Sequence, residues 1–150
     1  MTAKEYLLEL SEMREDIQLE KELRQEYLDM ATSISAPINE IRVQTSRSDN
    51  GKVERYGTLA ADIAMKIEQD EQNYHQHQYL IVNQIHALHN VYYIQILFKV
   101  YVKFRSIKQA ADEMKMTYQY VRDLHKKALE EFGNVHADVI AEWKKRKVME

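Results

Sequence analysis

Residues that interrupt helices and build tight turns are scarce in this chain. Its 150 residues include one proline and three glycines. A β-sandwich or β-barrel needs a turn roughly every 8–12 residues, and these turns are rich in glycine and proline. The composition therefore predicts an all-α protein, and it excludes collagen-like and low-complexity chains.

The size and composition are those of one globular domain. Hydrophobic residues make up 45% of the chain and charged residues 30%, which is enough apolar material to fold without a cofactor. The absence of cysteine excludes disulfides, thiolate metal sites and cysteine nucleophiles, and it fits a reducing cytoplasm. No apolar run approaches the roughly 18 residues of a membrane span, so we expect neither a signal peptide nor a membrane anchor.

Charge is distributed unevenly along the chain. The net charge of −3 combines −6 over residues 1–40 (4 Lys/Arg against 10 Asp/Glu), −1 over 41–96 (5 against 6) and +4 over 97–150 (12 against 8). A polyanion would be attracted to the C-terminal third and repelled by the N-terminal arm. Two solvated helix faces would give the same distribution.

The N-terminal residues predict a first long helix. Thr2 and Glu5 form a capping-box pattern, and Pro37 disfavours helix at the residue before it, so we expect the helix to end near Ser33. Its apolar residues are spaced by three or four apart from one slip, and they define a seam: Tyr6, Leu10, Met13, Ile17, Leu19, Leu23, Tyr27, Met30 and Ile34.

A second long helix is predicted after Gly57, with Thr58 as its N-cap and Asp62 in its first turn. Two polar residues interrupt its seam. Such residues set the register of a helix pair or face water more often than they hold a metal. Two such helices suggest an antiparallel hairpin or a coiled-coil dimer. The second seam runs through Leu59, Ile63, Ile67, Asp70, Tyr74, His77, Ile81, Ile85 and Leu88.

The stretch between these helices, residues 38–57, is predicted to be a surface loop because it contains the turn sequence Asp49-Asn50-Gly51. Four cations on this loop could bind phosphate or an acidic partner, although an ordinary solvated linker fits equally well. They form a secondary basic site: Arg42, Arg47, Lys52 and Arg55.

The C-terminal part predicts shorter helices. An aromatic-rich helix follows Asn90 through Phe104, and Ser106 with Gln109 forms a capping box for a helix ending near Met114. Thr117 can cap a further helix. A short helix, a turn of three or four residues and a longer helix are typical of a helix-turn-helix unit, and small residues at the crossing allow close approach. The crossing residues are Ala110 and Ala111, the turn wedge is Met116, and the inward residues of the last helix are Val121, Leu124, Ala128 and Leu129.

The outward face of the second helix of this unit predicts contact with double-stranded DNA. A recognition helix reads base edges with its N-terminal residues, so Gln119 could pair with adenine and Arg122 with guanine. Cations further along would contact phosphates. The predicted DNA-binding residues are Thr117, Tyr118, Gln119, Arg122, Lys126 and Lys127, with His125 as a further candidate for phosphate contact.

Residues 117–129, with the preceding Ala-Ala-Asp-Glu-Met, resemble region four of bacterial sigma factors. The family pattern has an isoleucine-alanine helix, a glycine turn, Ser/Thr, Val-Arg and a closing Lys-x-Ala-Leu, and a tyrosine is common where Tyr101 stands. The resemblance implies that Tyr118, Gln119 and Arg122 read bases and that Lys127 contacts the backbone. Lys115 replaces the turn glycine, which requires a left-handed lysine or a different turn. Tyr118 and Gln119 replace a charged pair, so no target sequence is implied.

With its N-terminal hairpin and the Arg42–Ser48 loop, the whole chain resembles small sigma-like phage proteins of Gram-positive bacteria, relatives of the ArpU-type transcriptional regulators. The resemblance implies a sequence-specific DNA-binding regulator in the cytoplasm of a bacterial host, associated with the nucleoid. Activation, repression and the target sequence remain open.

Catalysis and metal binding have little support in the sequence. The histidines at 75 and 77 face different sides of a helix, and those at 86 and 89 lack a nearby third ligand. There is no glycine-rich phosphate loop and no nucleophile beside a base. We therefore expect no enzyme activity, no metal and no cofactor.

We thus expect an all-α protein with two domains. Residues 1–89 would form a long helical hairpin for homodimer formation or partner binding, and residues 90–150 a helix-turn-helix domain of sigma region-four type with a basic tail, Lys144–Lys147. The alternative function is a non-catalytic interaction module in which the acidic hairpin engages host RNA polymerase or another host protein. Region four of sigma factors also binds the polymerase flap, so the resemblance is compatible with either.

Overall fold

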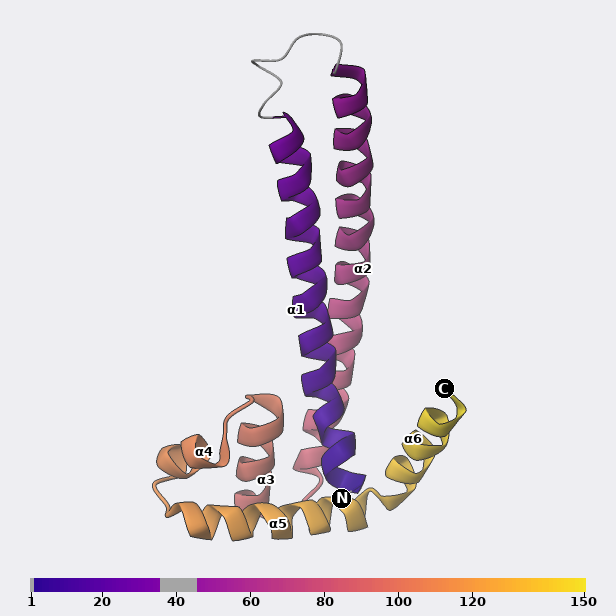
Figure 1. The fold of residues 1–150 in the computed structure, drawn as a ribbon. Helices are drawn as coiled ribbons and strands as arrows, with labels where there is room; N and C mark the ends of the chain where they lie inside the picture. The colour runs from indigo at the N-terminus through magenta and orange to yellow at the C-terminus, as the bar shows by residue number, and fades with distance from the viewer. Residues whose placement is uncertain (1, 36–45) are drawn as a thin grey trace. The chain divides into compact units, whose positions relative to one another are not determined.

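The computed structural model describes residues 2–35 and 46–150, and every secondary-structure element in this part of the chain is helical (Figure 1). The predicted all-α class is confirmed. Among the described residues, no helix combines the length and apolar character that crossing a lipid bilayer requires. The elements are α1 (Thr2–Ser35), α2 (Ser46–His86), α3 (Val91–Leu97), the π-helical segment η2 (Phe98–Val102), α4 (Ile107–Met114), α5 (Tyr118–Val135) and α6 (Ala137–Met149).

The chain divides into two compact units. Residues 1–13 and 74–150 form the first, here called the core unit, and residues 14–73 form the second, the two-helix unit. Sequence analysis placed a single boundary between residues 89 and 90. In the structure the first turns of α1 and the last turns of α2 share a hydrophobic core with the helices that follow residue 90.

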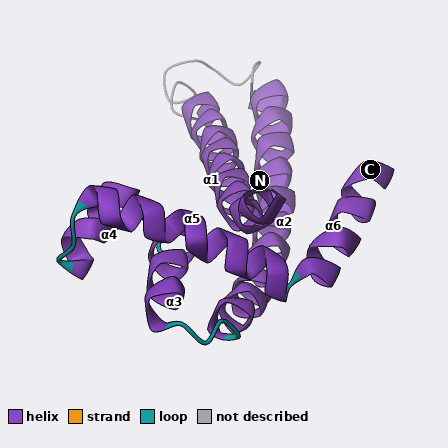
Figure 2. Cartoon of the chain, turned by 90° about the horizontal axis from the view of Figure 1, so that it is seen from below, coloured by secondary structure: helices purple, strands orange, loops and turns teal. Residues whose placement is uncertain are grey.

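The core unit is built around α5. In Figure 2, which views the chain from below, α3 and α4 pack beside α5. Short helices cannot bury enough apolar surface alone, so α1 and α2 add their own apolar residues to the same cluster. Its largest fully buried side chains are Tyr6, Leu7 and Leu10 of α1, Ile81 and Ile85 of α2, Leu88 just after α2, Ile96 and Leu97 of α3, and Val121 and Phe132 of α5.

Three polar contacts lie inside or at the edge of this core. The hydroxyl of Tyr6 donates a hydrogen bond of 2.8 Å to Oε1 of Gln84, which is itself only 8% exposed. The Nε2 atom of His136 lies 2.7 Å from the Gln84 carbonyl oxygen, at the junction of α5 and α6. The indole of Trp143 donates to a carboxylate oxygen of Glu9. These bonds connect α1, α2 and α6 across positions far apart in the sequence.

In the two-helix unit, α1 and α2 lie side by side and antiparallel (Figure 1). The ring centroids of Tyr27 and Tyr56 lie 6.1 Å apart. The Nζ atom of Lys66 lies 2.6 Å from Oε1 of Glu20 and 3.0 Å from Oδ2 of Asp70, and these partners raise the pKa of the lysine. Hydrogen bonding to Glu20 and, second, to Lys66 lowers the pKa of Asp70, whereas desolvation raises the pKa of Glu20.

The predicted seam of α2 is confirmed, since each described residue assigned to it is at least half-buried. The predicted seam of α1 is wrong at Leu19, Leu23 and Met30, whereas Tyr27 is half-buried as predicted and the side chain of Ile34 lies outside the described part. Leu19 is 62% exposed, Leu23 is 40% exposed and Met30 is 42% exposed, whereas Glu20 continues the inward face. The spacing from Ile17 to Leu19 is two residues instead of three or four. Each residue turns the helix by about 100°, so Leu19, Leu23 and Met30 rotate away from α2.

The predicted loop 38–57 is wrong for residues 46–57, which form the first turns of α2. Thr58 is not an N-cap, because its hydroxyl donates a hydrogen bond of 2.8 Å to the carbonyl oxygen of Glu54 within the helix. Lysine, glutamate and arginine favour helix here, and each glycine costs only about 1 kcal/mol relative to alanine, which a helix of 41 residues can absorb.

Candidate nucleic-acid interface

The α4 helix begins with the predicted capping box. The Gln109 amide donates a hydrogen bond of 3.1 Å to Oγ of Ser106, and the Ser106 amide donates one of 2.9 Å to Oε1 of Gln109. Ala110 and Ala111 are 0% and 2% exposed, respectively, so the predicted small residues lie inside the core. Methyl side chains at these positions let α4 approach its neighbours closely.

The turn between α4 and α5 contains a left-handed lysine. Lys115 has φ 58° and ψ 44°, which is the first of the two alternatives that the missing turn glycine left open. The Met116 amide donates a hydrogen bond of 3.0 Å to the carbonyl oxygen of Ala111, which closes α4 as in a Schellman motif. The half-buried Met116 side chain packs against the core as a wedge, as predicted.

The α5 helix begins where the sequence predicts. The hydroxyl of Thr117 accepts a hydrogen bond of 3.2 Å from the Tyr120 amide, so the threonine is the N-cap. The predicted inward residues Val121, Leu124 and Ala128 are buried, and Leu129 is half-buried. The exposed Thr117 remains at the start of the helix, but its hydroxyl is already occupied by the cap.

The outward face of α5 carries the predicted DNA-reading residues. Tyr118, Gln119, Arg122 and Lys126 are all exposed, and helical geometry places them within about 100° of arc around the axis. Lys127 is also exposed but lies about 100° beyond Lys126, on the flank of this face. Within the described chain, none of the three cations is in an ion pair.

The start of α5 adds a second attraction for anions. The first amides of a helix lack intrahelical partners, and the helix dipole places partial positive charge there. The Thr117 side chain accepts from the Tyr120 amide, so the cap does not use the backbone amides of Tyr118 and Gln119. A phosphate group could therefore bind at this end while side chains further along contact base edges.

The suggestion that His125 contacts phosphate is wrong. This residue is 9% exposed, and its Nε2 atom lies 2.7 Å from the hydroxyl of Tyr101. The two rings stack with centroids 5.6 Å apart. Burial, with a smaller contribution from Lys4, lowers the pKa of His125, and burial raises the pKa of Tyr101. His125 therefore anchors α5 from inside.

Three of the four residues of the predicted secondary basic site lie in α2 and not in a loop. Arg42 lies outside the described residues, and Arg47 lies in α2 with its side chain outside the described part. Lys52 and Arg55 are exposed on α2, and the guanidinium of Arg55 lies 5.3 Å from the centre of the Tyr56 ring. Arg47, Lys52 and Arg55 belong to the two-helix unit, whereas the α5 residues belong to the core unit.

The described residues offer few other candidates for metal binding, acid–base chemistry or anion binding. The described residues contain no group of three or more histidine, aspartate or glutamate side chains placed to hold a metal ion. His77 is half-buried, burial lowers its pKa, and its Nε2 atom has no hydrogen-bond partner within the described chain. Sequence analysis missed a second group of cations, Lys99, Lys103 and Arg105, because they are spread over a π-helical turn and the residues after it.

Comparisons with protein-family models, curated proteins and solved structures found no significant match.

Proposed function

We propose that this chain is a double-stranded DNA-binding regulator of transcription, with α4 and α5 acting as a helix-turn-helix unit. One observation carries the proposal. The polar face of α5 is exposed from its capped N-terminus onward, while the opposite face is held by the core. Its resemblance in sequence to region four of bacterial sigma factors supports the same assignment.

In this proposal α5 enters the major groove. Arg122 donates two hydrogen bonds to a guanine and Gln119 exchanges two with an adenine, each pair contributing about 1–3 kcal/mol of discrimination. Tyr118 contacts sugar or a thymine methyl group. Lys126 and Lys127 contact phosphates, which fixes the position of the helix without reading sequence.

A salt titration tests the proposal. In a dimer, two α5 helices could together neutralise six phosphates. A plot of log affinity for duplex DNA against log salt concentration would then have a slope of roughly −5. Selection of random duplexes by the full-length protein would test binding and report the preferred site in one experiment. No duplex binding at low salt would refute the proposal.

In this proposal the two-helix unit contributes self-association of the protein. A pair of helices with few fully buried side chains is marginal alone, and the exposed Leu19, Leu23 and Met30 offer further apolar surface. A homodimer would place two α5 helices on one duplex, and their binding free energies would roughly add.

The acidic charge of the N-terminal arm supports a second candidate, an interaction module that engages host RNA polymerase or another host protein. This candidate predicts no affinity for duplex DNA at low salt, together with recovery of a polymerase subunit by the immobilised protein. Duplex binding that depends on the α5 residues would count against it as the primary role.

A further inference from the structure

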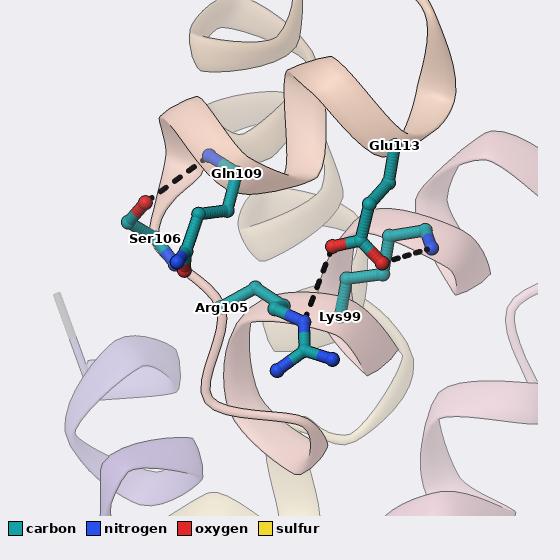
Figure 3. A network of polar contacts seen from close by, with 5 residues as sticks. All are labelled: Lys99, Arg105, Ser106, Gln109 and Glu113. Atoms are coloured by element: carbon teal, nitrogen blue, oxygen red, sulfur yellow. Dashed lines mark hydrogen bonds and ion pairs between the residues drawn. The ribbon is translucent and has the colours of Figure 1, made fainter.

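The core unit contains a second charged surface, distinct from the face of α5. A cavity of about 550 Å³ lies between η2 and α4, and no residue of α5 lines it among those described. Figure 3 shows the polar contacts at its edge. The residues that matter here are Phe98, Lys99, Lys103, Arg105, Glu113 and Met114, and we call this the basic pocket.

The basic pocket holds three cations around one carboxylate. Oε1 of Glu113 lies 3.3 Å from Nζ of Lys99, and Oε2 lies 3.2 Å from Nε of Arg105. Lys103 is in no ion pair within the described chain, and its Nζ atom lies 5.6 Å from the centre of the Phe98 ring. The local formal charge is therefore +2, so the pocket attracts an anion.

Glu113 fixes Arg105 in an orientation that leaves its donors available. The carboxylate contacts the guanidinium at Nε, while the two terminal nitrogens point away from it in Figure 3. A planar guanidinium binds a carboxylate through two parallel hydrogen bonds when such a fork is free. An arginine already held in place loses less side-chain entropy when it binds a partner.

The backbone beneath these cations has two uncommon features. Residues 98–102 form a π-helical turn, and Phe104 has φ 58°, a left-handed conformation that is rare for a bulky residue. A hydrogen bond of 2.9 Å from the Arg105 amide to the Lys99 carbonyl oxygen brings two of the cations together. Strained backbone of this kind is often kept at binding sites.

The floor of the basic pocket is apolar, because Phe98 and Met114 lie among its lining residues. A DNA backbone is convex and offers no side chain to fill such a cavity, and Glu113 would repel a polyanion more strongly than a single carboxylate. A protein segment can present both a carboxylate and an apolar side chain at once. The charge and the apolar floor together favour such a segment over nucleic acid.

We propose that the basic pocket binds an acidic segment of a partner protein in which a carboxylate lies beside a bulky apolar side chain. The carboxylate is held by Arg105 and Lys103, and the apolar side chain enters the space between Phe98 and Met114. The inference uses residues outside the proposed DNA interface, so it stands or fails independently of DNA binding.

A random peptide library displayed on phage, selected on the immobilised full-length protein, tests the proposal. Selected peptides should carry Asp or Glu beside Leu, Phe or Trp. A synthetic peptide made from the selected sequence should bind about tenfold more weakly to Lys103→Glu, whereas Lys108→Glu, the same charge change on α4 outside the pocket, should change binding less than about twofold. Replacing the peptide carboxylate by an amide should also weaken binding.

Two further measurements separate the possible outcomes. Backbone amide chemical shifts should change at residues 95–114 when the peptide binds, and circular dichroism should show that Lys103→Glu remains folded. Lys103→Glu should leave duplex DNA affinity unchanged, while Arg122→Ala should leave peptide affinity unchanged. Enrichment of peptides without carboxylates, or equal weakening of peptide binding by Lys108→Glu, would overturn the proposal.

Discussion

The hydroxyl of Tyr101 and the Nε2 atom of His125 lie 2.7 Å apart inside the core unit, with their rings stacked. Tyr101 belongs to the π-helical turn η2, and His125 lies on α5 one turn after Arg122. The bond therefore connects the backbone beneath the basic pocket to the helix that carries the proposed DNA-reading residues.

Removing this hydroxyl should destabilise the fold. Tyr101→Phe keeps the ring but leaves a buried imidazole nitrogen without a partner, which costs about 1–3 kcal/mol of the free energy of unfolding. Urea denaturation followed by circular dichroism measures the change. Tyr120→Phe, at a residue that is 53% exposed, is the matched control and should stay within about 0.5 kcal/mol of the parent. Equal losses in the two variants would contradict a role for the buried bond.

Stability should fall as the solution becomes acidic. Burial lowers the folded-state pKa of His125 and of His77, so the unfolded chain takes up protons first as the pH drops below about 6.5. Their contribution is complete above that pH and is lost as the pH falls toward the folded-state values. Urea midpoints between about pH 7.5 and pH 5.5 should therefore decrease.

The same titration can be assigned to a residue. His125→Gln removes one of the two groups and should flatten the dependence on pH, whatever its effect on absolute stability. His89→Gln, at an exposed position, should leave the slope unchanged. A slope that stays the same in His125→Gln would show that other groups cause the acid sensitivity.

A glycine at position 115 should stabilise the protein. Lys115 has φ 58°, and a left-handed conformation costs a residue with a Cβ atom about 1–2 kcal/mol, whereas glycine adopts it freely. Because glycine also makes the unfolded chain more flexible, we expect a net gain of about 0.5–1 kcal/mol in Lys115→Gly. Lys108→Gly, inside α4, should lose about 1 kcal/mol. Thermal unfolding of both variants would show whether the signs are opposite.

Local signals made much of α4 and α5 predictable. Ser106, Gln109 and Thr117 act through hydrogen bonds to amides within three residues, so the sequence alone identifies both helix starts. The replacement of the turn glycine by Lys115 left two alternatives, a left-handed lysine or a different turn, and the φ of 58° shows the first.

Other features depend on tertiary context that the sequence does not reveal. His125 lies between exposed and buried faces of α5, and only the position of Tyr101, 24 residues earlier, decides its burial. Residues 46–57 contain an Asp-Asn-Gly turn signal, yet they form the first turns of the long helix α2. The exposure of Leu19 follows from helix phase after a slip of two residues, which a pattern of spacings alone treats as continuous.

Two α5 substitutions should affect DNA binding differently. If Arg122 reads a base, Arg122→Ala should cost about 1–3 kcal/mol on the preferred duplex and reduce discrimination among duplexes. If Lys127 contacts phosphate, Lys127→Ala should weaken all duplexes alike and reduce the salt slope by about 1. Fluorescence anisotropy with selected and scrambled duplexes measures both effects. Lys145→Ala, on α6, serves as the cation control.

Self-association should depend on the exposed apolar face of α1. The double substitution Leu19→Gln and Leu23→Gln removes apolar surface at residues that are 62% and 40% exposed, so it should shift a dimer toward monomer with little change in helix content. Sedimentation velocity over a range of protein concentrations measures the shift. Ile17→Gln, at a residue that is 8% exposed, should instead unfold the local helix pair. An unchanged dimer in the double variant would place the contact elsewhere.

The interleaving of residues 1–13 and 74–150 in one core has a consequence for how the protein is made. The ribosome releases Tyr6 long before Phe132 of α5 and Trp143 of α6, whose ring centroids lie 6.0 Å and 5.6 Å from that of the tyrosine. Contacts so distant in sequence form slowly. Tyr6 must therefore wait, uncovered on the side that α5 and α6 later fill, until the ribosome has synthesised those helices, and removing residues 1–13 would deprive α5 of part of its support.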